Sequence, residues 1–312
     1  MKGKVRLALA LAASILVLLA LPLALKHKGH PALVGPDLSE LEYSEVLFEN
    51  PQAGLQLAGM LFLPKGEGPF PTAVIMHGSG TSRRNSVWYL SVAEYLRDNG
   101  IAVLLPDKRG SEKSQGDWVG ASFEDLATDT LSAVEFVRSQ GAFQPSAIGL
   151  IGMSQGGWIA PVVATGTDDV SFVASMAGAA VTTDEQLLHE ETHNIAHYTY
   201  TPIAGLLAQI TTRRLKRLDH LAAFMGFDPI PYWERVDVPV FFAYGGNDEN
   251  VPIDASVARL GERGLSRFSV NVYPDGGHAI RDTRTNRVNK AFLDDLVAFI
   301  KESSAKGRSD RG

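Results

Sequence analysis

A buried strand runs through a tight, glycine-rich turn into an apolar helix near the middle of the sequence, and few folds contain that arrangement. The strand reads AIGLIG from Ala147, the turn reads GMSQG from Gly152 to Gly156, and GWIAPVVA follows as the helix. Such a turn brings backbone segments close together, so a side chain at Gly152 or Gly156 is expected to clash. The turn is therefore predicted to lift the hydroxyl of Ser154 to the carboxyl edge of a sheet.

Apolar runs and helical patterns alternate along the rest of the chain. Strands are expected at Tyr43–Phe48, Leu55–Leu63, Thr72–Met76, Ala102–Leu105, Ala147–Ile151, Phe172–Met176, Val240–Tyr244 and Phe268–Tyr273. Helices are expected at Trp88–Asp98, Phe123–Ser139, Gly157–Ala164, Ala255–Arg263 and Asn286–Glu302. Two successive strands followed by strand–helix repetition predict an α/β fold, with a mostly parallel eight-stranded sheet, an antiparallel start and helices on both faces.

The alternation is interrupted once, between Ala179 and Val238. This stretch carries helical patterns and aromatic residues but no strand pattern. At about 60 residues it is too long for a plain connection, so we expect a helical lid over about residues 180–237. The domain that contains it is predicted to span residues 42–304, after a linker at 31–41 and before a polar tail at 305–312.

The first 30 residues are typical of an export signal. Three basic residues precede an uncharged run of 19 residues, Leu7–Leu25, close to the roughly 20 residues that span a bilayer. Neither candidate cleavage site has a small residue at the minus-three position, which favours an uncleaved signal anchor over a cleaved signal peptide. The greater number of basic residues before the run predicts a cytoplasmic N-terminus, with the domain outside the cytoplasm. Cleavage would instead give a secreted or periplasmic protein.

Composition excludes several classes of protein. The chain has 312 residues and no cysteine, so thiol nucleophiles, thiolate metal sites and disulfides are ruled out. Without the five basic residues of the N-terminal segment, 24 basic residues stand against 35 acidic ones, a formal charge of −11. An acidic domain argues against nucleic acid as a partner.

A serine hydroxyl needs a general base, and the base needs an acid to orient it. Asp248 follows the strand VPVFFAYGG, and His278 follows the strand RFSVNVY. Both are expected just beyond carboxyl ends of strands, where open α/β sheets bind their ligands. The order Ser154, Asp248, His278 predicts a catalytic triad, with Asp254 and Asp275 as rival acids.

Nucleophilic attack on an acyl carbon also requires two N–H groups that stabilise the oxyanion. One is expected from Gln155, which follows the nucleophile and lies at a helix N-terminus. The other is expected from the loop His77-Gly78-Ser79-Gly80 after the third strand. We favour Ser79 over Gly78 as the second donor.

With these motifs together, the sequence resembles the serine α/β-hydrolase superfamily over roughly Glu42 to Glu302. It is similar to bacterial esterases of the dienelactone-hydrolase/serine-aminopeptidase-like branch in MHGSG (76–80), LLPDKRGSEKSQGDW (104–118), IGLIGMSQGGWIAP (148–161), YGGNDENVP (244–252) and DGGH (275–278). The resemblance implies an α/β-hydrolase fold, a Ser154–Asp248–His278 triad, an acyl-enzyme intermediate, and no metal or other cofactor.

Two positions depart from the common patterns of this branch. Met153 stands where His is frequent, and Glu112 replaces the second glycine of the usual D-x-R-G-x-G stretch. The segment after Asp107 is structural or lines the pocket in relatives, so Asp107 and Arg109 are not expected to be catalytic.

The expected function is a carboxylesterase that acts on small-molecule esters with short- or medium-chain acyl groups. An acyl thioesterase or a serine exopeptidase would use the same chemistry, and a non-catalytic binding protein is a further alternative. The oligomeric state is left open by the sequence.

Two other patterns compete for a function. His189-Glu190-Glu191-Thr192-His193 matches the zinc motif H-E-x-x-H, and His197 continues the same helix face. The metzincin extension and a downstream glutamate ligand are missing, so a polar lid helix is favoured over a metal-dependent hydrolase. A basic cluster, Arg213, Arg214, Lys216 and Arg217, is either a solvated helix face or a contact for an anionic membrane or substrate.

Overall fold

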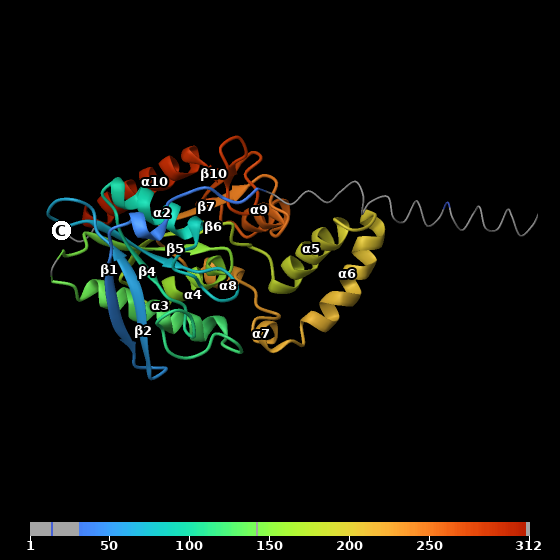
Figure 1. The fold of residues 1–312 in the computed structure, drawn as a ribbon, viewed down its shortest axis with the longest axis horizontal. Coiled ribbons are helices and arrows are strands. Elements are labelled where there is room, and N and C mark those ends of the chain that lie inside the picture. The colour runs from blue at the N-terminus through green and yellow to red at the C-terminus, as the bar shows by residue number, and fades with distance from the viewer. Residues whose placement is uncertain (1–13, 15–30, 142, 310–312) are drawn as a thin grey trace, which may run out of the picture.

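The computed structural model describes residues 14, 31–141 and 143–309, and an eight-stranded sheet lies at its centre (Figure 1). The sheet order is β1-β2-β4-β3-β5-β6-β7-β8. β1 pairs with β2, and β2 with β4, in antiparallel fashion, whereas all other neighbours are parallel. The predicted mostly parallel sheet with an antiparallel start is confirmed. The strands are β1 (Ser44–Asn50), β2 (Leu55–Phe62), β3 (Pro71–Met76), β4 (Ala102–Pro106), β5 (Ala147–Met153), β6 (Val170–Met176), β7 (Val240–Gly245) and β8 (Ser269–Tyr273).

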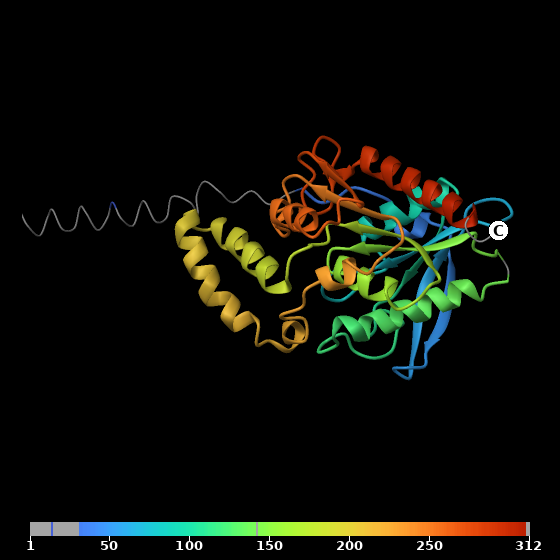
Figure 2. The same cartoon turned by 180° about the vertical axis from the view of Figure 1, so that it is seen from behind.

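Successive side chains of a strand point to opposite faces of the sheet, and this alternation produces two cores. On β3, Val74 and Met76 belong to one apolar cluster, whereas Ala73 and Ile75 belong to the other. The first cluster contains buried residues of α3 and α4, and the second contains those of α2 and α10. Figures 1 and 2 show these two helix pairs on opposite faces of the sheet. The helices are α2 (Val87–Asp98), α3 (Phe123–Arg138), α4 (Gly156–Ala164), α9 (Ile253–Glu262) and α10 (Lys290–Ser309).

The C-terminal helix begins later than the apolar pattern predicted. Asn286 has a φ of 54°, which is incompatible with the start of a helix. It belongs to a small hairpin of β9 (Arg281–Asp282) and β10 (Arg287–Val288), and α10 follows after Asn289, whose side chain accepts from the backbone N–H of Ala291 at 2.9 Å. At its other end α10 continues to Ser309, into the segment predicted as a polar tail.

The segment at 31–41, predicted as a linker, packs on the domain. It contains the 3-10 helix η1 (Leu38–Glu40), and Leu41 is buried in the core. The backbone N–H of Val34 donates to Asn286 at 2.7 Å. The chain is thus held against the domain before β1 begins.

The predicted N-terminal export segment, residues 1–30, lies outside the described residues except for Ser14. In the part of the chain that the structure describes, no helix combines the length and hydropathy needed to cross a bilayer.

Four helices and no strand lie between β6 and β7: α5 (Thr183–Ala196), α6 (Thr201–Leu215), α7 (Asp219–Ala222) and α8 (Ile230–Trp233). α5 and α6 pack on each other and extend away from the sheet beyond the carboxyl ends of its parallel strands (Figures 1 and 2). α8 returns the chain to the core, where the fully buried ring of Trp233 lies 4.9 Å from that of Phe242. We call residues 180–237 the inserted segment.

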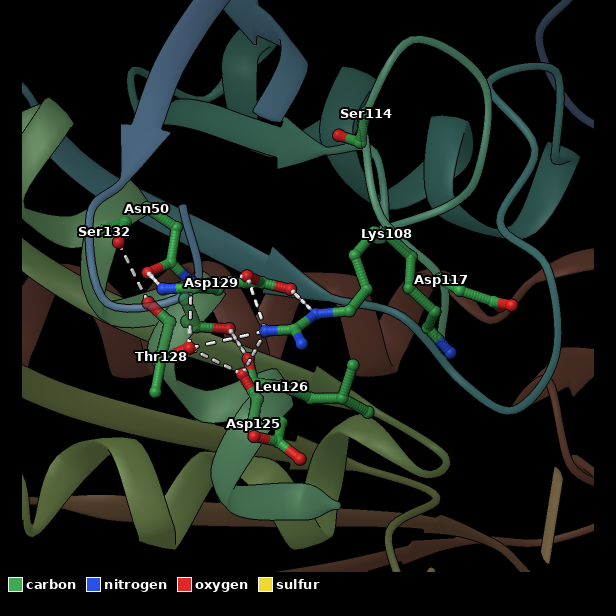
Figure 3. A network of polar contacts seen from close by, with 12 residues as sticks. Asn50, Lys108, Ser114, Asp117, Asp125, Leu126, Thr128, Asp129 and Ser132 are labelled. Atoms are coloured by element: carbon green, nitrogen blue, oxygen red, sulfur yellow. Dashed lines mark hydrogen bonds and ion pairs between the residues drawn. The ribbon is translucent and has the colours of Figure 1, made fainter. Parts of the chain in front are cut away.

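A largely buried ion pair joins the loop after β4 to α3 and β1 (Figure 3). Arg109 donates to both carboxylate oxygens of Asp129, at 2.6 and 2.9 Å, and to the carbonyl oxygen of Asp125 at 2.6 Å. Asn50, at the end of β1, donates to Asp129 at 2.7 Å and to Thr128 at 2.8 Å. These contacts connect the loop after β4 to α3 and to the end of β1.

Replacing Arg109 with methionine should leave the Asp129 carboxylate, whose side chain is 14% exposed, without its cation. We expect the free energy of unfolding, measured by urea denaturation, to fall by about 3 kcal/mol. The double variant Arg109→Met/Asp129→Leu should recover part of that loss, because it leaves no charge behind. The control is Arg138→Met, which breaks an exposed pair with Glu135 and should cost about 0.5 kcal/mol or less. If Arg109→Met and Arg138→Met lowered the free energy of unfolding equally, the pair between Arg109 and Asp129 would stabilise the fold no more than an exposed pair does, and the prediction would be wrong.

Candidate active site

The turn between β5 and α4 holds Ser154 in a strained conformation. Its φ is 55°, a value that non-glycine residues rarely adopt. A Cβ on Gly152 would lie 2.3 Å from the carbonyl oxygen of Gly156, and a Cβ on Gly156 would lie 2.4 Å from that of Met76. Both distances are far below van der Waals contact, so the expected need for glycine at these two positions is confirmed.

Three side chains from separate parts of the chain form a continuous hydrogen-bonded series. The hydroxyl of Ser154 lies 2.9 Å from Nε2 of His278, and Nδ1 of His278 lies 2.9 and 3.1 Å from the carboxylate oxygens of Asp248. An ionised carboxylate only accepts, so Nδ1–H donates to Asp248 and Nε2 accepts from the serine. The imidazole is thereby held in the tautomer that can remove the serine proton.

The carboxylate of Asp248 is enclosed by protein. Its side chain has no solvent exposure, and Oδ1 also accepts from the backbone N–H groups of Asn250 at 2.9 Å and Val251 at 3.2 Å. Of the rival acids, Asp275 accepts instead from Asn247 at 3.1 Å, and Asp254 lies in the first turn of α9. The structure therefore brings Asp248, the acid favoured by the sequence, to the imidazole.

A second histidine near the serine is structural. Nε2 of His77 donates to the carbonyl oxygen of Pro106 at 2.6 Å, and burial lowers the pKa of His77 to about 3. The ring stays neutral and packs edge-on against Tyr89. The hydroxyl of Tyr89 accepts from the backbone N–H of Gly78 at 2.8 Å. That contact occupies Gly78 and leaves Ser79 as the candidate second oxyanion donor.

One residue at the site was missed by the sequence reasoning. The amine of Lys108 is buried and donates to the carbonyl oxygen of Gly78, to that of Gly80 at 3.0 Å and to Oε1 of Gln155 at 3.1 Å. It thus contacts both segments that were predicted to supply oxyanion donors. The only signal in the sequence is a lysine directly after a buried strand, between Asp107 and Arg109, and lysines there are usually solvated.

The H-E-x-x-H segment lies on α5, next to the loop that carries Asp248, residues 246–252, which we call the acid loop. Glu190 accepts from the side chain of Asn250 at 3.3 Å, and Gln186 donates to the carbonyl oxygen of Asn250 at 3.1 Å. His197 lies 2.8 Å from Glu249. Burial raises the pKa of Glu190. These contacts fasten the inserted segment to the acid loop.

The two histidines of the motif interact along their own helix. Nδ1 of His193 lies 2.9 Å from the carbonyl oxygen of His189, and the two ring centres are 4.2 Å apart. Within residues 31–141 and 143–309, no group of three or more His, Cys, Asp or Glu side chains is arranged to hold a metal ion.

Comparison with known proteins identifies a family. Residues 87–307 match the prolyl oligopeptidase family. Acylamino-acid-releasing enzyme 1 of Oryza sativa subsp. japonica is 26% identical over 241 residues, which cover 75% of this chain and 30% of that enzyme. Esterase EstD of Thermotoga maritima is 24% identical over 281 residues, covering 78% of this chain and 65% of that protein. The chain thus spans less than a third of the first relative's length and about two thirds of the second's.

A solved structure supports the fold. An esterase from Pyrococcus furiosus superposes with a TM-score of 0.64 at 18% sequence identity, covering 89% of this chain and 100% of that one. At this identity the likeness shows the α/β-hydrolase fold alone.

A fluorophosphonate probe, which reacts with activated serines of any substrate class, should label Ser154. Asp248→Asn should slow labelling at neutral pH by about 10⁴-fold, because the amide favours the wrong imidazole tautomer. Asp275→Asn is the matched control and should label at the wild-type rate. If mass spectrometry located the label on another serine, this assignment would be contradicted. It would also be contradicted if Asp275→Asn slowed labelling more than Asp248→Asn does.

Proposed function

The chain belongs to the prolyl oligopeptidase family, and from this premise we propose that it is a carboxylesterase for short- and medium-chain acyl esters. It is a hydrolase of the serine α/β type. The observation that carries the proposal is the series Ser154–His278–Asp248, with both hydrogen bonds at 2.9 Å.

In the proposed reaction Ser154 attacks the acyl carbon while Nε2 of His278 takes its proton. Asp248 keeps the imidazole oriented and stabilises its charged form. The oxyanion accepts from the backbone N–H groups of Gln155 and Ser79, and removing one such donor typically costs about 10²–10³ in rate. His278 then protonates the leaving alcohol, and water attacks the acyl-enzyme by the same steps in reverse.

The choice of an ester is supported by how much of each relative is matched. The similarity covers 65% of the Thermotoga maritima esterase but 30% of the rice acylamino-acid-releasing enzyme. A serine exopeptidase is the alternative function, and the similarity to the rice enzyme favours it. Thioesters would be cleaved through the same acyl-enzyme and are a further alternative.

We also propose that the protein is exported and held at a membrane by its N-terminal segment. The uncharged run Leu7–Leu25, with basic residues on both sides, supports this location. The proposed active site would then act on substrates outside the cytoplasm.

Turnover of p-nitrophenyl esters of increasing acyl length tests the proposed substrate class. The full chain should cleave the acetate and butyrate esters fastest, with and without EDTA, and Ser154→Ala should lower kcat by at least about 10⁴-fold. An acyl-CoA and an N-acylated amino acid p-nitroanilide, assayed in parallel, report thioesterase and peptidase activity.

Higher kcat/KM for the anilide or for acyl-CoA than for every ester would overturn the carboxylesterase proposal but keep the serine mechanism. Activity that is lost with EDTA and kept in Ser154→Ala would overturn both, and would favour the histidines of α5.

A further inference from the structure

Large apolar side chains are exposed mainly on the inserted segment. Of the twelve exposed large hydrophobic residues in the described part of the chain, seven lie between Leu188 and Leu218. Four belong to α6, and Leu206 among them is 62% exposed. Such a concentration on one short helix is unusual for a surface that faces only water.

Seven exposed residues on or just after α6 form a single stripe, which we call the α6 stripe. Its members recur at three- and four-residue spacing and are Ile203, Leu206, Leu207, Ile210, Arg213, Arg214 and Arg217, the last just beyond the helix end. The opposite face carries the buried residues Ala204, Ala208 and Thr212. α6 packs on α5, which is itself fastened to the acid loop. α6 lies on the far side of α5 from the sheet (Figures 1 and 2), and the stripe is on the face of α6 opposite to its buried residues.

The charges of this face have one sign. Thr201–Leu215 contains no acidic residue, although residues 31–312 together carry a formal charge of −11. Lys216 is paired with Asp184, whereas the three arginines of the stripe form no ion pair with any residue that the structure describes. An apolar helix face continued by arginines is the arrangement that binds at the interface of an anionic bilayer, with apolar residues among the acyl chains and arginines at phosphates.

We propose that the α6 stripe is a docking surface for a membrane that contains anionic phospholipids. The acidic remainder of the domain is repelled by such a membrane, so binding through α6 also sets the orientation of the domain. The same stripe on a second copy of the chain fits less well. Two such stripes would bring arginines against arginines, and α6 has no acidic side chain to pair with them. An anionic substrate at Ser154 fits less well because α5 lies between the stripe and the acid loop.

The absence of cysteine from the chain allows a direct test. A single cysteine at Leu206→Cys in the full-length protein, labelled with the environment-sensitive dye NBD, should shift to the blue and brighten on vesicles of phosphatidylcholine with phosphatidylglycerol. The same dye at Leu47→Cys, an exposed apolar position on the edge strand β1, should not change. Adding Arg213→Gln, Arg214→Gln and Arg217→Gln to the Leu206 variant should require about 100-fold more lipid for the same shift.

Three results would overturn the proposal. The dye at position 206 stays in water while the protein sediments with the vesicles. The shift occurs without lipid and grows with protein concentration, which would identify a second copy as the occupant. The shift occurs with palmitoyl-CoA below its micelle concentration but not with vesicles, which would identify a substrate surface.

A separate observation concerns Lys108. Its Nζ reaches the carbonyl oxygens of Gly78 and Gly80 and the side chain of Gln155. The carbonyl of Gly78 and the N–H of Ser79 belong to the same peptide unit, which is planar and in the trans form holds the two groups in opposite directions. A cation bound to the oxygen therefore sets where the N–H points and increases its polarity.

We infer that Lys108 is a positioning residue for the oxyanion site. Its ammonium group holds the peptide unit that contains the Ser79 N–H through the carbonyl oxygen of Gly78. The same group holds the side chain of Gln155, and the backbone N–H of Gln155 is the other proposed donor. This inference rests on the proposed serine mechanism, and it adds a residue that acts through the two segments with the proposed donors.

The three acceptors around Nζ require the ammonium form, because a neutral amine has only two N–H groups. Burial lowers the pKa of Lys108 to about 7. The other titratable groups around it change little near that pH, since the pKa of His77 is about 3 and that of Tyr89 about 12. Asp107 and Asp129 are paired with arginines. As pH rises through about 7, Lys108 loses a proton and one hydrogen bond, so kcat is expected to fall.

Lys108→Met should lower kcat for p-nitrophenyl acetate by about 10²-fold, leave KM nearly unchanged and remove the decline of kcat above pH 7. Lys108→Arg should restore part of kcat and move the decline to higher pH. The control is Lys113→Met, an exposed lysine in the same loop that pairs with Glu45, which should behave as wild type. Thermal unfolding of each variant reports whether the fold is kept.

The rate of fluorophosphonate labelling separates this inference from the proposed substrate. If esters are not turned over but Lys108→Met still labels about 10²-fold more slowly than wild type, the positioning role stands and the esterase proposal falls. Labelling and kcat within twofold of wild type would overturn the positioning role. If Lys108→Met does not fold, a wild-type kcat that stays constant from pH 7 to 9 overturns it.

Discussion

Three backbone segments meet around Ser154 at distances that leave no room for a Cβ, and the proposed chemistry depends on that close approach. Gly152 and Gly156 allow the turn to pass against the end of β3, which places Ser154 at the carboxyl edge of the sheet. Because β7 and β8 run parallel to β5, the loops after them begin at the same edge of the sheet. Asp248 and His278, which lie in these loops, consequently meet Ser154.

Three successive charged residues after β4 stabilise three different parts of the molecule. Asp107 binds Arg84 at 2.7 Å, Arg109 binds Asp129 on α3, and the amine of Lys108 reaches the loop after β3 and the side chain of Gln155. Each charged group is buried, and its desolvation is offset only because its partners are held in place. The same loop therefore connects the stability of the domain with the geometry proposed for the oxyanion site.

The inserted segment has two distinct surfaces. α5 is hydrogen-bonded to the acid loop through Gln186 and Glu190, so a movement of the inserted segment would shift the loop that carries Asp248. α6 presents apolar and cationic side chains on its outer face. With the proposed N-terminal anchor, docking of α6 would hold the proposed active site near a membrane from which acyl esters could be taken.

The sequence alone determined the succession of strands and helices along the chain, the elbow and the order Ser154, Asp248, His278, because each depends on local periodicity or on a short motif. Only the tertiary structure decided what depends on contacts between distant segments. Asn286 fits a helical pattern but adopts a left-handed conformation within a hairpin, so α10 begins later. Lys108 resembles a solvated lysine in sequence, yet it is buried against acceptors 28 to 47 residues away. No local pattern encodes such partners, because burial and hydrogen bonding are set by whatever the completed sheet brings together.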